Sequence, residues 1–306
     1  MARTTHCIKC GQELTKENRI AFQHTTGTRY MCAHCASIYN CAGSYSTENH
    51  MRVSKETTTG ATISKEMELP RKYSYTLTNG ERATLNAYMT SQGWLCTPDG
   101  SVYQEWKTPI YNSLQSYSKI SKTFEKLAQV SKWRDDMSYG THTNVGHARL
   151  DIKVIRKFYE SLFCRLYETM KSDESRVKEL YGRTFTGYAQ AYSPDLAPRS
   201  GSDGYAVNDS FTASEHLLAI NVQHKTHIEF RLNKYISFEQ DNKVSKYAID
   251  TVLACVEFCD AIRDNRTKYT GAELVNANKA SADKASRKID NIYRKYVGLP
   301  RVNKTA

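Results

Sequence analysis

The sequence predicts an α+β fold with a largely antiparallel, curved sheet and flanking helices. Short segments in which polar and apolar residues alternate occur between stretches with helical periodicity. These strands and helices do not alternate regularly, as parallel βαβ units would require. Residues 216–232 contain two such strands separated by a short polar turn, which is the connection of an antiparallel pair. Together these observations favour an antiparallel sheet.

The elements expected after residue 60 follow from the periodicity of the sequence. Alternation indicates the strands, and apolar residues every three or four positions indicate the helices. Asp151 is a good N-cap for the helix that follows it. In order, we expect a strand at 62–69, a strand and a helix within 73–92, a turn and strand at 99–108, a helix at 114–130, a strand at 140–146, a helix at 151–166, a loop at 193–210, strands at 216–222 and 227–232, and a helix at 245–263.

The 306 residues are enough for about two domains and a substantial core. The net charge of +11 permits contact with nucleic acid or with an anionic nucleotide, although an ordinary basic surface explains it equally well. No segment approaches the roughly 20 apolar residues of a membrane-spanning helix, and the N-terminus lacks the apolar run of a secretion signal. We expect a cytoplasmic protein without membrane contact.

Composition divides the chain into four segments. Residues 1–45 are rich in cysteine, and 46–59 form a polar linker. A catalytic domain is expected at 60–264, followed by a basic helical tail at 265–306. That tail is either a solvated helix or a contact surface for nucleic acid or protein.

The first segment contains two Cys-x-x-Cys pairs, formed by Cys7, Cys10, Cys32 and Cys35. Two such pairs can place four thiolates around one tetrahedral Zn²⁺. His6, His34 and Cys41 are alternative ligands. Because so short a segment has little core, the metal would supply its folding energy. The sequence therefore predicts a structural zinc module, which would bind protein or nucleic acid or simply cap the fold.

The strands at 62–69 and 227–232 place charged side chains on one face. Glu66 and Glu68 point the same way, and so do His227, Glu229 and Arg231. Carboxylates among apolar residues are costly to bury unless they are paired or bind a metal. Exposed strands with alternating charge and a simple cross-strand ion pair are the structural alternatives.

Further candidate residues lie on other segments. Asp99 is in an Asp-Gly-Ser turn, Glu105 is on the following strand, and His142 and Asn144 share one strand face. Taken singly, each has an ordinary structural explanation. Carboxylate ligands suit Mg²⁺ or Mn²⁺, and Mg²⁺ normally arrives with a nucleotide phosphate. Arg183, like the arginine at 231, could neutralise a transferring phosphoryl group.

The order of these motifs resembles the amidoligase family, relatives of glutamine synthetase and glutamate–cysteine ligase. The resemblance covers roughly residues 60–262. Its motifs are Ser64-Lys65-Glu66-Met67-Glu68, Asp99-Gly100-Ser101, Glu105-Trp106-Lys107-Thr108-Pro109, Gly140-Thr141-His142-Thr143-Asn144, Arg183 to Tyr188, and Ala219-Ile220-Asn221 through Ile228-Glu229-Phe230-Arg231. The chain departs from the family pattern at Ser64, where glycine is usual, and at Asn144, where a second histidine is usual.

The resemblance implies a glutamine synthetase-like catalytic domain that uses ATP to join a carboxylate to an amine, either of them a small molecule, a peptide or a protein. It assigns Mg²⁺ binding to Glu66, Glu68, Glu105 and Glu229. It makes His142 and Asn144 cofactor contacts. Arg231 would stabilise the phosphoryl group, Arg183 would hold ATP or the substrate carboxylate, and Asp99 would orient a ligand, accept a proton from the amine or shape the turn.

Two other functions fit part of the sequence. A Mg²⁺-dependent nuclease with a zinc module would use the basic charge and the acidic cluster. A non-catalytic adaptor on a ligase-like fold would account for Asn144, because an asparagine is a poorer metal ligand than a histidine.

Overall fold

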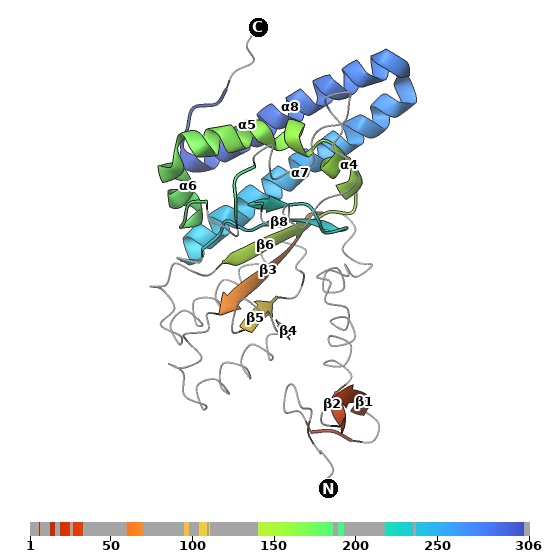
Figure 1. Cartoon of the computed structure of the whole chain (residues 1–306), viewed down its shortest axis with the longest axis vertical. Helices are drawn as coiled ribbons and strands as arrows, with labels where there is room; N and C mark the ends of the chain where they lie inside the picture. Colours follow the sequence, from red (N-terminus) through yellow and green to blue (C-terminus); the bar gives the residue numbers. More distant parts are fainter. Residues whose placement is uncertain are drawn as a thin grey trace.

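The computed structural model describes residues 6, 13–15, 19–24, 27–32, 60–69, 95–97, 104–108, 110, 140–185, 189–192, 218–234 and 237–302. Within these residues the chain forms two antiparallel sheets and a layer of helices (Figure 1). The smaller sheet pairs β1 (Arg19–His24) with β2 (Gly27–Cys32). The larger sheet carries the charged residues of interest.

The larger sheet has six strands in the order β4-β5-β3-β6-β8-β7, and all its neighbours are antiparallel. This confirms the predicted α+β class with an antiparallel sheet. The long β3 lies between β5 and β6, so the middle of the sheet is built by segments far apart in sequence. The strands are β3 (Thr62–Leu69), β4 (Leu95–Thr97), β5 (Gln104–Lys107), β6 (Thr141–Gly146), β7 (Ile220–Asn221) and β8 (His227–Phe230).

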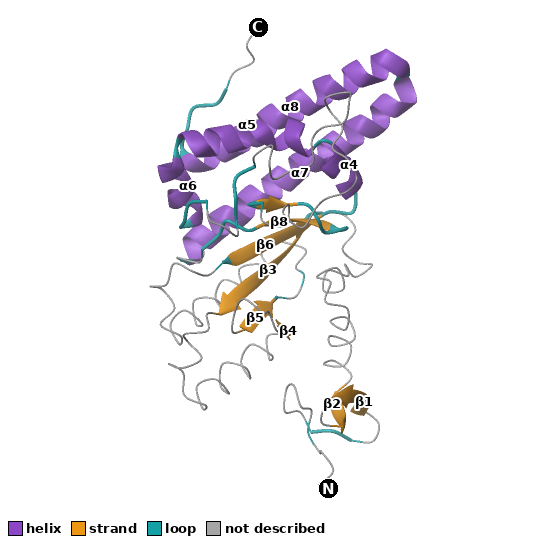
Figure 2. Ribbon diagram, viewed as in Figure 1, coloured by secondary structure: helices purple, strands orange, loops and turns teal. Residues whose placement is uncertain are grey.

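The helices gather on one side of this sheet (Figure 2). Two long helices form an antiparallel hairpin, and the first of them lies against β6. The helices are α4 (Ile152–Lys157), α5 (Tyr159–Ser172), α6 (Glu174–Tyr181), α7 (Phe238–Lys268) and α8 (Gly271–Val297). Among the described residues, no helix is both long enough and apolar enough to cross a membrane.

Alternation along the strands separates the core face from the polar face. Met67, Val145 and Phe230 belong to the same buried cluster as residues of the helices. Each of them is flanked in its strand by residues that point to the opposite face. The helix layer therefore covers the apolar face of the sheet, and the charged residues occupy the other face.

Helix ends follow from local capping. Asp151 accepts hydrogen bonds from the backbone amides of Lys153 and Val154, as its N-cap position predicts. The helix expected at 245–263 is longer at both ends, because Ser237 caps it with a hydrogen bond from the Gln240 amide. The expected helix at 151–166 is interrupted at Phe158, where α4 ends and α5 begins.

The other expected elements have different outcomes. The strand at 62–69 matches β3, and 140–146 matches β6 within one residue. The hairpin at 216–232 is present as the shorter β7 and β8. The helical part of the expected basic tail, α8, packs against α5 and α7 and buries Ile289 and Tyr293. The elements expected at 73–92, 114–130 and 193–210 and the linker at 46–59 lie outside the described residues.

Candidate functional site

Strand register brings the acidic residues to one face of the sheet. Glu66 stands opposite Lys107 on β5 and opposite His142 on β6. Glu68 stands opposite Glu105. Directly opposed residues of an antiparallel pair point to the same face, so their side chains are neighbours. The charged side chains on this face of β5, β3 and β6 form a cluster because the three strands are adjacent.

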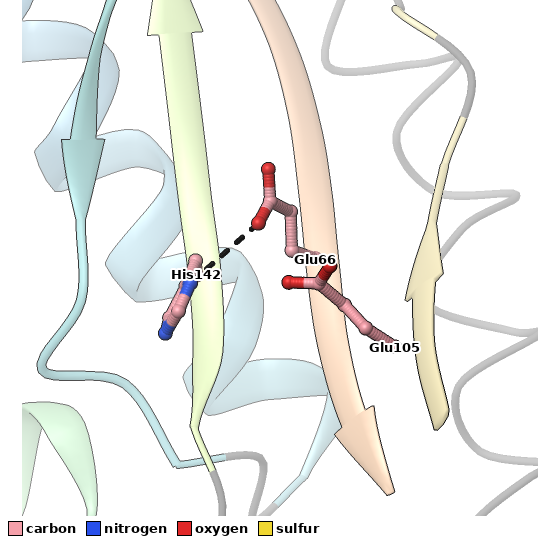
Figure 3. Close-up of side chains that lie close together, drawn as sticks. All are labelled: Glu66, Glu105 and His142. Atoms are coloured by element: carbon pink, nitrogen blue, oxygen red, sulfur yellow. Dashed lines mark ion pairs between the residues drawn. The ribbon is translucent and has the colours of Figure 1, made fainter. Parts of the chain in front are cut away.

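The centre of the cluster is a group of three buried side chains (Figure 3). Glu66, Glu105 and His142 each offer a ligand atom, and these atoms lie within 4.8 Å of one another. His142 Nδ1 is 3.7 Å from Glu66 Oε2. Two carboxylates and an imidazole form a donor set that suits Mg²⁺, Mn²⁺ or a transition metal. The residues present therefore fit a divalent cation.

Glu229 extends the group along β6 and β8. Its Oε1 lies 2.8 Å from His142 Nδ1. Arg231 Nη1 donates to the same oxygen at 3.1 Å. The other carboxylate oxygen of Glu229, Oε2, accepts a hydrogen bond from Asn221 Nδ2 at 2.7 Å and lies 3.0 Å from His224 Nε2. So many partners hold this buried carboxylate in one orientation.

Glu68 is tied to Gly140, the residue that directly precedes β6. Its Oε2 accepts a hydrogen bond from the Gly140 amide at 2.9 Å. A Cβ at Gly140 would lie 3.1 Å from both Arg183 Nη2 and His142 Nε2. This crowding explains why a glycine stands here. It also shows that Arg183, from the segment after α6, lies beside the acidic group.

Lys107 sits between two of the carboxylates. Its Nζ is 3.2 Å from Glu105 Oε2 and 3.5 Å from Glu66 Oε1. Burial raises the pKa of Glu66, but Lys107 and His142 outweigh it and hold that pKa below the ordinary value. Burial, and next the charge of Glu66, raise the pKa of Glu105 to about 7. Adjacent carboxylates are thus shifted in opposite directions.

His142 responds to the same charges. Burial and then Arg231 lower its pKa, but Glu229 and Glu66 outweigh them and raise it to about 9. A protonated imidazole is a stand-in for a metal ion, since both place positive charge between carboxylates. A bound divalent cation would have to displace that proton. The cluster is therefore arranged to hold positive charge.

Asn144 supports the group from the side. Its Nδ2 donates to Glu66 Oε1 at 2.9 Å, so the amide orients a candidate metal ligand. Within the described ranges, the Asn144 Oδ1 atom is buried and has no hydrogen-bond partner. The asparagine that departs from the family pattern is therefore part of the site.

The structure brings together eight residues that were predicted from the sequence, on β3, β5, β6, β8 and the segments that follow α6 and β8. These are Glu66, Glu68, Glu105, His142, Asn144, Arg183, Glu229 and Arg231. The other predicted site residues, Asp99, Cys7, Cys10 and Cys35, lie outside the described residues, and of Cys32 only the backbone in β2 is described.

Four residues of the site were not predicted from the sequence. Lys107 follows Glu105 by two positions, so alternation could have indicated it. Asn221 lies within a motif of the resemblance. Gly140 opens another such motif, but its backbone donation to Glu68 and the space that it leaves were not expected. His224 is in the turn between β7 and β8 and carries no local signal.

Comparison with known proteins does not add a family to this description. No protein-family model matches the chain. No curated protein has a significantly similar sequence.

Proposed function

We propose that this protein is an ATP- and Mg²⁺-dependent ligase that joins a carboxylate to an amine through an acyl phosphate. One observation carries the proposal. Carboxylates from β3, β5 and β8 and a histidine from β6 converge on one buried face, with Arg183 and Arg231 beside them. Such a face suits phosphoryl transfer, where metal ions and arginines stabilise negative charge.

The chemistry has two steps. A carboxylate oxygen of one substrate attacks the γ-phosphorus of ATP, and ADP leaves. The nitrogen of the amine then attacks the acyl carbon, loses a proton, and inorganic phosphate leaves. Because water would hydrolyse the acyl phosphate, burial of the site is a requirement of the reaction.

The residues take roles that follow from their contacts. Glu66, Glu105 and His142 would hold a divalent cation, with Glu68 and Glu229 as its flanking acidic ligands. That cation, when bound, would neutralise phosphate oxygens as a Lewis acid. Arg231 would stabilise the transferred phosphoryl group, because a planar guanidinium can donate two hydrogen bonds to phosphate oxygens at once. Arg183 would hold ATP or the carboxylate substrate.

The remaining roles rest on the sequence. Asp99 is proposed to orient a ligand, accept a proton from the amine or shape a turn. Cys7, Cys10, Cys32 and Cys35 are proposed to hold a structural Zn²⁺ that would support a protein or nucleic-acid contact. The basic helical segment after residue 264 is a second candidate for such contact.

Phosphate release is the test. Purified full-length protein is given ATP and Mg²⁺ with pools of carboxylates and amines, including peptides. We expect phosphate release that requires both pools. Glu105→Gln should reduce it by about 100-fold or more, the size expected when one preorganised charge contact is lost. Glu257→Gln is the matched control, since Glu257 is exposed on α7 and, among the described residues, forms an ion pair with Lys288 alone.

The choice of Glu105 keeps the result interpretable. The pKa of Glu105 is raised to about 7, so removing its charge should not unfold the protein. Degradation of DNA or RNA without ATP would support a nuclease instead. Absence of both activities, with Mn²⁺ still bound, would support a non-catalytic adaptor.

A further inference from the structure

A second polar group lies on the same face of the sheet, away from Glu105. It consists of Thr62 on β3, Asn144 on β6 and His227 on β8, which are 2%, 1% and 0% exposed. In the described part of the chain, Thr62 Oγ1, Asn144 Oδ1 and His227 Nε2 are all buried without a hydrogen-bond partner. Each such atom costs about 1–3 kcal/mol. That a single patch collects three of them indicates that a ligand supplies the missing partners.

The strand register gathers the three side chains around Gly146. Thr62 is opposite Gly146 on one side, and His227 is opposite it on the other. Asn144 precedes Gly146 by two positions and shares its face. A Cβ at Gly146 would lie 3.0 Å from Thr62 Oγ1 and 3.1 Å from the Thr226 carbonyl oxygen. A side chain at residue 146 would therefore crowd the Thr62 hydroxyl, so the glycine keeps this edge of the patch clear.

The atoms of the patch are acceptors. Hydroxyl and amide oxygens accept hydrogen bonds. His227 Nδ1 lies 3.2 Å from Thr226 Oγ1. When Nδ1 carries the proton and donates it there, Nε2 is left as an acceptor. Three acceptors match the three N–H donors of a primary ammonium group.

The charges beside the patch favour a cation with N–H donors. Glu229 is directly opposite Asn144, and Glu66 accepts the hydrogen bond of the Asn144 amide. Both carboxylates attract a positive group. The patch itself offers only neutral ligands, whereas Mg²⁺ is bound through carboxylates and water. An ammonium group therefore fits the patch better than a second divalent cation does.

We propose that Thr62, Asn144 and His227 form a subsite for a primary ammonium group, which holds the amine substrate beside the metal group. This assignment rests on the proposed ligase function for its role in the reaction. As a binding site, it is defined by the three acceptors alone. It predicts that the amine substrate is a primary amine that arrives in its charged form and must lose one proton, in addition to the proton lost on attack, before its nitrogen reacts with the acyl phosphate.

Methylammonium is the probe, because it carries the proposed group and little else. Binding to the full-length protein is followed by broadening of its ¹³C resonance near neutral pH, where methylammonium is protonated. Thr62→Val removes one acceptor and should weaken binding about tenfold, as expected for a hydrogen bond to a charged group. Thr62→Ser keeps the hydroxyl and should restore binding. His227→Phe should weaken binding by a similar factor.

Thr251→Val is the matched control. Thr251 lies on α7, is 0% exposed, and also has a hydroxyl without a partner in the described residues. Both valine variants therefore remove a buried, unpartnered hydroxyl, but only the one at residue 62 should change methylammonium binding. Equal binding in the two variants, or no saturable binding by the wild type, would overturn the subsite and leave bound water as the partner of these atoms.

The ligase and the subsite can fail separately. Methylammonium binding that depends on Thr62, without any ATP turnover, would support the subsite and count against the ligase. ATP turnover that depends on Glu105 but is insensitive to Thr62→Val at low amine concentration would support the ligase and overturn the subsite.

Discussion

The buried charged residues on the two faces of strand β3 have different partners. Lys65, which is 0% exposed, points toward the helices and pairs with Asp241 of α7 at 2.7 Å. Its Nζ also donates to Thr143 Oγ1 at 2.7 Å. The next residue, Glu66, points the other way into a group that contains Glu105 and Glu229. On the helix side the described contacts join a cation to an anion, whereas on the polar face several carboxylates share the nearby cations.

The difference separates a structural ion pair from a candidate site. Burial lowers the pKa of Lys65 and raises that of Asp241, and their mutual attraction only partly offsets it. In both groups the pKa is therefore shifted in the direction that disfavours the charged form. On the polar face, Glu66 and Glu105 are shifted in opposite directions. Opposite shifts in adjacent groups are typical of functional sites.

The largest expected effect is on the helix side. Asp241→Ala should destabilise the protein by about 3–5 kcal/mol, because it removes a carboxylate that lies 2.7 Å from the buried Lys65 ammonium group. Urea unfolding measures the change. The double variant Lys65→Met with Asp241→Leu should recover most of this loss, since well-packed apolar residues often replace a buried pair at little cost. A double variant as unstable as the single one would contradict a purely structural role.

On the polar face, removing one of the charged groups should increase the free energy of unfolding instead of lowering it. Glu105→Gln should stabilise the metal-free protein by about 1–3 kcal/mol near pH 8, because the folded state resists ionising this carboxyl. Glu66→Gln should destabilise it, because the pKa of Glu66 is held below its ordinary value. Both variants should lose Mn²⁺ binding, measured by calorimetry. Equal stability changes would show that the two carboxylates do not differ as proposed.

Gly140→Ala should affect the site more than the fold. The added Cβ would push against Arg183, His142 and Glu68 at 3.1–3.2 Å. We expect Mn²⁺ affinity to fall about tenfold, or about 1.4 kcal/mol, through this displacement. Gly298→Ala is not a suitable control, because Gly298 has a φ of 72°, which strains other residues. Gly60→Ala is better, as nothing lies within 4 Å of its added Cβ.

The smallest effect concerns pH on the helix side. Burial raises the pKa of Tyr247 to about 12 from an ordinary 10.0. The unfolded chain therefore loses this proton first, so stability is full below about pH 10 and falls as pH rises toward 12. Near pH 10.5, Tyr247→Phe should reduce this pH-dependent loss of unfolding free energy by about 1 kcal/mol. The variant keeps the edge-on ring contacts with Phe230 and Tyr181. Thermal unfolding at pH 7 and pH 10.5 tests this, and identical pH dependence in wild type and variant would refute it.

Much of the site could be predicted because its residues lie on strands. Alternation alone placed Glu66 with Glu68 and His142 with Asn144, and the structure keeps both pairs on one face. His224, which acts from a turn, was missed, and Gly140 was part of a quoted motif without a role assigned to it. The Lys65–Asp241 pair was missed as well, because its members are 176 residues apart in sequence and no local pattern links them.

The fold class, the faces of the strands and the residue types available for chemistry could be predicted from the sequence. These properties depend on local periodicity, which is a feature of neighbouring residues. The position of β3 between β5 and β6, by which Glu66 faces both Lys107 and His142, is a property of the folded chain. Strand pairing and pKa shifts depend on distances through space. The candidate metal group exists because three segments of the chain meet, which none of them encodes alone.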